Sequence, residues 1–125
     1  MILITGGFSQ GKRTFAEEKL GVSGLVADGA SAGAEEIRRA DLLIHYHLLV
    51  KRQLERGLDP QAEAEKLAAE NPDLVITVTE LGCGIVPADA FDRRWRECTG
   101  RCSCLLAEKA DAVYRVLCGI GTRIR

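Results

Sequence analysis

Short apolar runs alternate along the chain with stretches whose apolar positions recur at helical spacing. The runs at residues 2–4, 24–28 and 74–79 have the length of strands that are buried on both faces of a parallel sheet. A fourth run, at 113–118, precedes a glycine turn and residues 122–125, which we expect to pair back on it. The pattern therefore predicts a sheet that is parallel except at its last strand.

Amphipathic stretches separate these strands. Leu42, Tyr46 and Leu49 recur at three- and four-residue spacing, which favours a helix that is already established at position 41. Asp59 and Pro60 are typical of the N-cap and first turn of another helix. The expected helices cover residues 13–20, 34–57, 60–70 and a long segment after 87. Helices alternating with strands predict an α/β three-layer sandwich, with residues 1–125 forming a single domain.

Composition is that of a globular protein. The 125 residues are 46% hydrophobic and 28% charged, which supports one core and excludes a disordered or low-complexity chain. The net charge of −1 argues against a general nucleic-acid binder.

Targeting signals are not evident in the sequence. No apolar run reaches the length of a membrane span, and the first five residues lack the basic region of a signal peptide. Five cysteines, an odd number, then suggest reduced thiols in a cytoplasmic protein.

The strongest chemical signal is Gly6-x4-Gly11-Lys12, placed between the first strand and the first helix. Glycines let successive backbone N–H groups turn toward a phosphate, and the lysine reaches its oxygens. The alternative is an ordinary glycine-rich turn with an incidental lysine. The sequence favours a phosphate loop, whose candidate nucleotide-binding residues are Gly6, Gly7, Phe8, Ser9, Gln10, Gly11, Lys12, Arg13 and Thr14.

One position departs from the full phosphate-loop motif. A Ser or Thr that binds Mg²⁺ usually follows the lysine, but Arg13 stands there and Thr14 comes one residue later. Thr14 could replace the missing hydroxyl through a shifted first turn, Arg13 could itself neutralise phosphate charge, or the loop could bind nucleotide with weak metal dependence. Glu80 ends a buried strand, where it could face Lys12 and hold a metal or position the acceptor. We predict Lys12 and Glu80 as catalytic residues, and Thr14 and Glu80 as Mg²⁺ ligands.

Three blocks together resemble the adenosylcobinamide kinase / adenosylcobinamide-phosphate guanylyltransferase family of cobalamin biosynthesis. They are the phosphate loop, Thr79-Glu80-Leu81-Gly82-Cys83-Gly84-Ile85-Val86-Pro87, and Val116-Leu117-Cys118-Gly119-Ile120-Gly121-Thr122-Arg123-Ile124. The resemblance implies a P-loop NTPase-like fold, usually a homotrimer, that uses GTP or ATP. It also implies phosphorylation of a corrinoid side-chain hydroxyl, followed by GMP transfer through a guanylylated histidine.

The middle of the chain departs from that pattern. The strand that usually ends in an aspartate reads Leu42-Leu43-Ile44-His45, and the segment with the guanylylated histidine has no counterpart. The resemblance predicts kinase-like phosphoryl transfer, and the missing histidine segment argues against guanylyl transfer. The alternative is a catalytically impaired nucleotide- or corrinoid-binding regulator.

Other candidate residues favour structural roles. Cys98, Cys102 and Cys104 do not have zinc-site spacing, and we expect Cys98 and Cys102 to be buried thiols on the apolar side of a helix. His45 and His47, two apart on the expected helix, would point to different sides and could not share one metal. Phe91 and Trp95 are expected to anchor the core rather than to stack on a base.

Overall fold

The computed structural model describes residues 1–81 and 89–125. Within these residues a six-stranded sheet has the order β2-β3-β4-β1-β5-β6. Neighbouring strands pair in parallel, except that β5 and β6 pair antiparallel. The strands are β1 (Ile2–Gly6), β2 (Val26–Asp28), β3 (Leu42–Ile44), β4 (Val75–Thr79), β5 (Ala112–Leu117) and β6 (Ile120–Arg123). The predicted α/β fold with a mainly parallel sheet is confirmed.

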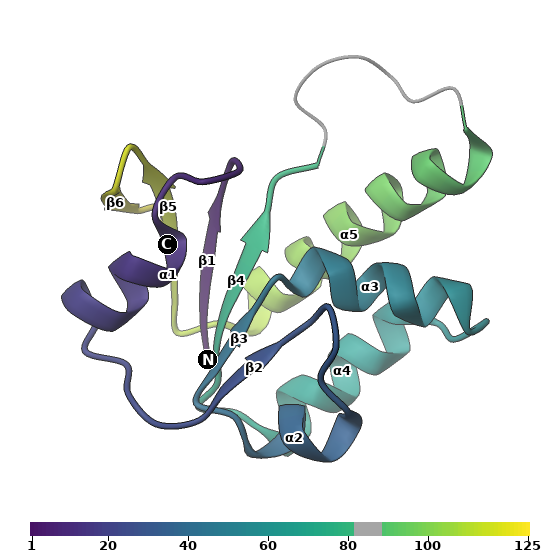
Figure 1. Ribbon diagram of the computed structural model, residues 1–125, viewed down its shortest axis with the longest axis horizontal. Coiled ribbons are helices and arrows are strands. Elements are labelled where there is room, and N and C mark those ends of the chain that lie inside the picture. The colour runs from purple at the N-terminus through teal and green to yellow at the C-terminus, as the bar shows by residue number, and fades with distance from the viewer. Residues whose placement is uncertain (82–88) are drawn as a thin grey trace.

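Helices lie on both sides of the sheet (Figure 1). The short helix α1 and the π-helical turn η1 that continues it lie on one side, and α3, α4 and α5 lie on the other. The helices are α1 (Lys12–Thr14), η1 (Phe15–Lys19), α2 (Ala34–Arg39), α3 (Tyr46–Glu55), α4 (Pro60–Glu70) and α5 (Ala90–Lys109). This is the three-layer arrangement that the alternating pattern predicts.

The core is divided by the sheet into two clusters, because successive side chains of a strand point to opposite faces. Leu3 and Ile76 belong to the larger cluster, which contains buried residues of α3 and α5. Ile4 and Val75, their chain neighbours, belong to the smaller cluster with Phe15 of η1. Unbroken apolar runs are therefore required in the central strands, which are covered on both faces.

The prediction of a helix that is already established at position 41 is wrong for residues 41–45. Leu42–Ile44 forms strand β3, all three side chains are buried, and the strand pairs with both β2 and β4. Only from Tyr46 does the chain become the helix α3. Leu42 happens to fit the helical spacing of Tyr46 and Leu49, but burial between two strands decides its structure.

The antiparallel C-terminal hairpin packs against the helical turn that follows the glycine loop. Gly121 of β6 lies so close to the Phe15 ring that a Cβ at this position would overlap the ring carbons. The hairpin also supplies Val116 to the smaller core cluster. The last strands therefore support the first helix directly, although the two are far apart in sequence.

We predict that Gly121→Ala destabilises the protein by about 1–3 kcal/mol, because the added methyl group must displace a buried aromatic ring. Gly100→Ala is the matched control. Gly100 lies within α5 with open space around it, so this change should stabilise the protein by about 0.5–1 kcal/mol. Urea unfolding measures both, and equal effects of the two substitutions would contradict the proposed packing.

Candidate functional site

The glycine loop joins β1 to α1 without an intervening segment. Gly11 is the residue before α1 and has φ 88°, a left-handed backbone conformation that residues other than glycine rarely adopt. Its carbonyl accepts a hydrogen bond from Phe15 N at 2.9 Å, so the helical turns begin at once. The loop thus places Lys12 at the first helical position, next to the end of the central strand.

The loop is held by the turn between β5 and β6. The Gln10 side-chain carbonyl accepts a hydrogen bond from Cys118 N at 2.8 Å. The Gln10 backbone carbonyl accepts another from Gly119 N at 2.8 Å. One residue of the loop is thereby fixed at two points by the C-terminal block.

Beside the loop lies a cavity of about 470 Å³, a size typical of small-molecule sites. Its walls come from the glycine loop, the ends of β3 and β4, and the helices α3 and α5. The residues are Phe8, Ser9, Gln10, Gly11, Lys12, Arg13, Thr14, Ile44, His45, His47, Leu48, Thr77, Thr79 and Trp95. Seven of the nine predicted nucleotide-binding residues therefore line one cavity, and Gly6 and Gly7 lead into it.

Lys12 and Glu80 follow strands β1 and β4, which pair with each other, and the charge of Glu80 acts on Lys12. Lys12 Nζ donates to Gly7 O at 2.6 Å, across the base of the loop. Burial lowers the pKa of Lys12, and the Glu80 carboxylate partly opposes that shift. Glu80 N donates to Gly6 O at 2.9 Å, so the backbone carries Glu80 beside the start of the loop.

The donors present do not fit the predicted magnesium site. Both Glu80 oxygens accept hydrogen bonds from Arg115, Nε to Oε1 at 3.0 Å and Nη2 to Oε2 at 3.3 Å. Thr14 lines the cavity, but Glu80 is not among the lining residues. In residues 1–81 and 89–125 no group of three or more His, Cys, Asp or Glu side chains is arranged to hold a metal. A carboxylate that is already paired with a guanidinium is a poor ligand for Mg²⁺.

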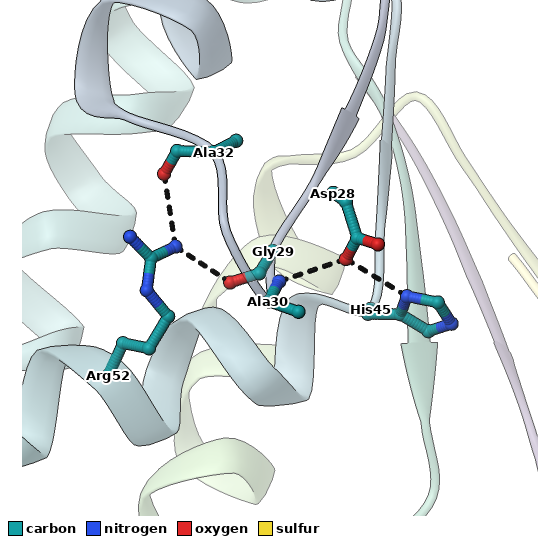
Figure 2. A network of polar contacts seen from close by, with 6 residues as sticks. All are labelled: Asp28, Gly29, Ala30, Ala32, His45 and Arg52. Atoms are coloured by element: carbon teal, nitrogen blue, oxygen red, sulfur yellow. Dashed lines mark hydrogen bonds and ion pairs between the residues drawn. The ribbon is translucent and has the colours of Figure 1, made fainter.

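A second polar centre lies at the ends of β2 and β3, which pair Asp28 with Ile44. Figure 2 shows the Asp28 carboxylate between the Ala30 backbone and the His45 ring. Asp28 Oδ1 accepts from Ala30 N at 2.9 Å and lies 3.0 Å from His45 Nδ1. Partial burial acts to raise the pKa of Asp28, but hydrogen bonds from Ala30 and His45 and the charges of His45 and Arg13 lower it overall.

The backbone around this centre is constrained. His45 has φ 56° and ψ 46°, the left-handed conformation, directly before α3. Such a conformation costs a non-glycine residue about 1–3 kcal/mol and persists only where its surroundings impose it. Gly29 N donates to Ile44 O at 2.8 Å. Arg52 Nη1 reaches Gly29 O at 2.9 Å and Ala32 O at 3.0 Å (Figure 2), which fixes the loop that follows Asp28.

His47 occupies the wall of the cavity among aromatic rings. Its side chain is buried, its ring is stacked on Trp95 at 6.2 Å between centroids, and Phe8 meets it edge-on at 6.0 Å. Trp95 Nε1 donates to His47 O at 2.7 Å. Burial, together with the charges of His45 and Lys12, lowers the pKa of His47 to about 4. His47 is therefore neutral at pH 7.

The structure changes the sequence-based view of the two histidines. His45 precedes the helix instead of belonging to it, and the two rings lie 5.9 Å apart. The expectation that they point to different sides of one helix is therefore wrong, because it required helix at position 45. Trp95 packs against the core as predicted, yet it also lines the cavity.

Several residues in and beside the cavity were not identified from the sequence. Thr77 and Thr79 are buried in β4, where they read as ordinary β-branched strand residues. Asp28 ends a predicted strand, the same position that singled out Glu80, and this signal could have identified it. His45 follows residues 42–44, which the helical spacing assigned to a helix, whereas the family resemblance aligned them with a strand, as the structure has them.

The cysteines of the described segments are structural or exposed. Cys102 is fully buried in the larger core cluster, and burial raises its pKa to about 11. Cys98 is half-buried against the same cluster, while Cys104 and Cys118 are exposed. The prediction of buried thiols on the apolar side of α5 is confirmed for Cys102. Cys83 lies outside the described residues.

Comparison with known proteins identifies the family. A sequence model described as cobinamide kinase / cobinamide phosphate guanyltransferase matches residues 39–124, more than half of the chain. The chain belongs to this family. The matched region contains Glu80 and the C-terminal hairpin, whereas the glycine loop lies before it. The block at 79–87 that carried the resemblance extends into residues 82–88, which are outside the described part of the chain.

Two curated proteins are similar over the same length of chain. Both carry the name bifunctional adenosylcobalamin biosynthesis protein CobU. The protein from Salmonella typhimurium LT2 is 38% identical over 74 residues, and the one from Escherichia coli K12 is 34% identical over 74 residues. Each match covers 58% of this chain and 41% of the relative. The chain is thus matched to less than half the length of either relative, and the activities in their shared name belong to the longer proteins.

None of the helices in the described segments combines the length and apolarity that a membrane crossing needs.

We predict that the buried neutral His47 makes folding sensitive to mild acid. Its pKa is about 6.5 when unfolded and about 4 when folded, so its contribution is complete above pH 6.5 and is lost as the pH falls toward 4. Between pH 7 and pH 5 this costs about 2 kcal/mol of unfolding free energy. Urea titrations at the two pH values measure it.

His47→Gln should remove this loss, and His45→Gln should retain it, since the chain has two histidines. An unchanged pH dependence in His47→Gln would show that another group is responsible.

Proposed function

We propose that the chain binds the triphosphate of a purine nucleoside, GTP or ATP, in the cavity beside the glycine loop. We propose further that it transfers the γ-phosphoryl group to a hydroxyl of a corrinoid side arm, as adenosylcobinamide kinase activity would require. The observation that carries this proposal is the convergence of the loop from Phe8 to Thr14 with Lys12 on one cavity. The names of the family and of the two curated relatives support the corrinoid substrate.

The loop residues have distinct tasks in this proposal. Backbone N–H groups and Lys12 would hold the β- and γ-phosphates, and a phosphate oxygen would replace Gly7 O as the acceptor for Lys12 Nζ. Arg13 also lines the cavity, half-exposed, and pairs with Glu17 at 2.5 Å. It would add positive charge where related loops carry a metal-binding hydroxyl. Glu80, held by Arg115, would position Lys12 through their mutual attraction.

Guanylyl transfer is not part of this proposal. That reaction needs a nucleophile for the covalent intermediate. In the family the resemblance implies a histidine for it, on a segment without a counterpart in this sequence. We also infer a cytoplasmic homo-oligomer, a trimer by resemblance to the family.

A second candidate is a protein that binds the nucleotide or corrinoid without catalysis and acts as a regulator. The pairing of both Glu80 oxygens with Arg115 favours it, as does Arg13 in place of a metal-binding hydroxyl. This candidate predicts nucleotide binding that is insensitive to Mg²⁺ chelation and no phosphorylated corrinoid. Strict dependence of binding on Mg²⁺ would contradict it.

We predict that Lys12→Ala weakens triphosphate binding at least 10-fold and abolishes formation of phosphorylated cobinamide, because it removes the cation nearest the loop. Calorimetry with GTP and ATP measures binding. Transfer of labelled γ-phosphate to cobinamide, with Mg²⁺ and with chelator, measures the reaction.

Lys66→Ala is the matched control. Lys66 is exposed on α4 and lines neither pocket that the glycine loop forms, so its removal changes net charge equally and should leave binding within about 2-fold. An equal loss of binding in both variants would show that Lys12 acts only through the net charge of the protein. Failure of the unmodified protein to bind either nucleotide would contradict the proposed function.

A further inference from the structure

Asp28 and His45 form a hydrogen-bonded pair at the carboxyl ends of β2 and β3, and His45 lines the same cavity as Lys12. We propose that His45 accepts the proton of the hydroxyl group that attacks the γ-phosphate, and that Asp28 is its positioning residue. This inference rests on the phosphoryl transfer proposed above. It names the group that receives the proton in that reaction.

The geometry fixes which ring nitrogen is available. Asp28 Oδ1 already accepts from Ala30 N, and an ionised carboxylate can only accept, so His45 Nδ1 carries the proton in the 3.0 Å contact. The neutral ring then has its lone pair on Nε2. Figure 2 shows Nε2 on the side of the ring that points away from Asp28.

The backbone fixes the positions of Asp28 and His45. His45 adopts its left-handed conformation at the junction of β3 and α3, and Arg52 of α3 holds the carbonyl groups of Gly29 and Ala32 in the loop after Asp28. Both members of the pair are therefore placed by the two strands and by the helix that follows them. A carboxylate that orients the imidazole of a base in this way is a recurring arrangement in enzymes.

Besides His45, few described residues of the cavity wall could accept a proton. None of the described residues that line it is Asp or Glu. His47, the other imidazole, is buried, and its Nδ1 has no hydrogen-bond partner in the described residues. With its pKa lowered to about 4, His47 is the weaker base. His45, about half exposed and paired with a carboxylate, is the accessible one.

Charged groups from several elements act on this pair. The positive charge of Arg13 in α1 helps to lower the pKa of Asp28. The charges of Lys12 and His45 lower the pKa of the neighbouring His47 in α3. Asp28 is the anion in direct contact with the His45 ring, with 3.0 Å between Oδ1 and Nδ1. Lys12 and Arg13 line the same cavity as His45.

The proposed step conserves atoms and charge. The hydroxyl oxygen forms a bond to the γ-phosphorus as the bond from that phosphorus to the β–γ bridging oxygen breaks. The bonding pair leaves with the nucleoside diphosphate, and the hydroxyl proton moves to His45 Nε2. The imidazolium then releases that proton to water.

The test is the pH profile of kcat for phosphate transfer from GTP or ATP to cobinamide, measured from pH 5 to 9 with the full chain. In the unmodified protein kcat should fall in acid as Nε2 becomes protonated. His45→Gln should lower kcat at least 100-fold and abolish the acid limb. Asp28→Asn should shift the limb to lower pH, because the imidazolium loses its carboxylate partner.

Asp41→Asn is the matched control. Asp41 also lies next to β3, where its Oδ2 accepts from Leu25 N at 2.8 Å, but it is at the opposite end of that strand. Its removal should leave the acid limb in place. Calorimetry should give nucleotide Kd values within about 2-fold for all three variants, which shows that each is folded and loaded.

The possible failures are distinguishable. If the unmodified protein transfers phosphate and His45→Gln keeps its rate and its acid limb, this inference is overturned and the proposed function stands. The same holds if Asp28→Asn and Asp41→Asn move the limb equally. If the unmodified protein transfers no phosphate at any pH, the proposed transfer is overturned and this inference falls with it.

Discussion

The hydrogen-bonded pairing of β1 between β4 and β5 is the constraint on which the rest of the structure depends. The register pairs Gly6 with Thr79, so the first strand ends level with the strand that leads to Glu80. Its other edge pairs with β5, whose continuation holds Gln10 through Cys118. A strand of five residues thus brings together the beginning, the middle and the end of the chain at one edge of the sheet. No local interaction within the loop could achieve this.

Charge is distributed unevenly at that edge. The cavity wall carries Lys12 and Arg13, while the nearby carboxylates, Glu80 and Asp28, are each engaged by a partner outside the loop. An anion entering the cavity therefore meets fixed positive charge, and no carboxylate stands among the described residues of the wall. This arrangement suits a phosphate ligand electrostatically, and it differs from a site that is organised around a metal ion.

Local patterns predicted what local forces determine. The glycine spacing before Lys12, the Asp59 N-cap and the buried strand at 75–79 follow from backbone preference and burial, and the structure shows each of them. The strand at 42–44 could not be predicted in this way, because its three residues are consistent with helical spacing and become a strand only between β2 and β4.

That ambiguity hid part of the site. The conformation of His45, its contact with Asp28 and the burial of His47 all depend on where the strand ends and the helix begins. The pairing of Glu80 with Arg115 likewise could not be predicted from the sequence. The two residues lie 35 positions apart, and the sheet places Arg115 of β5 beside Glu80. Contacts between residues that are far apart in the sequence therefore could not be predicted from local residue spacing.

The environment of Trp95 has an optical consequence. It is the one tryptophan in the 125-residue sequence, and it lies in the cavity wall, stacked on the His47 ring with the Lys51 ammonium 4.9 Å from its ring centroid. An indole flanked by an imidazole and a cation emits light that responds to small changes in the position and charge of either neighbour. The intrinsic fluorescence of the unlabelled protein should therefore report when the cavity beside the glycine loop fills or empties.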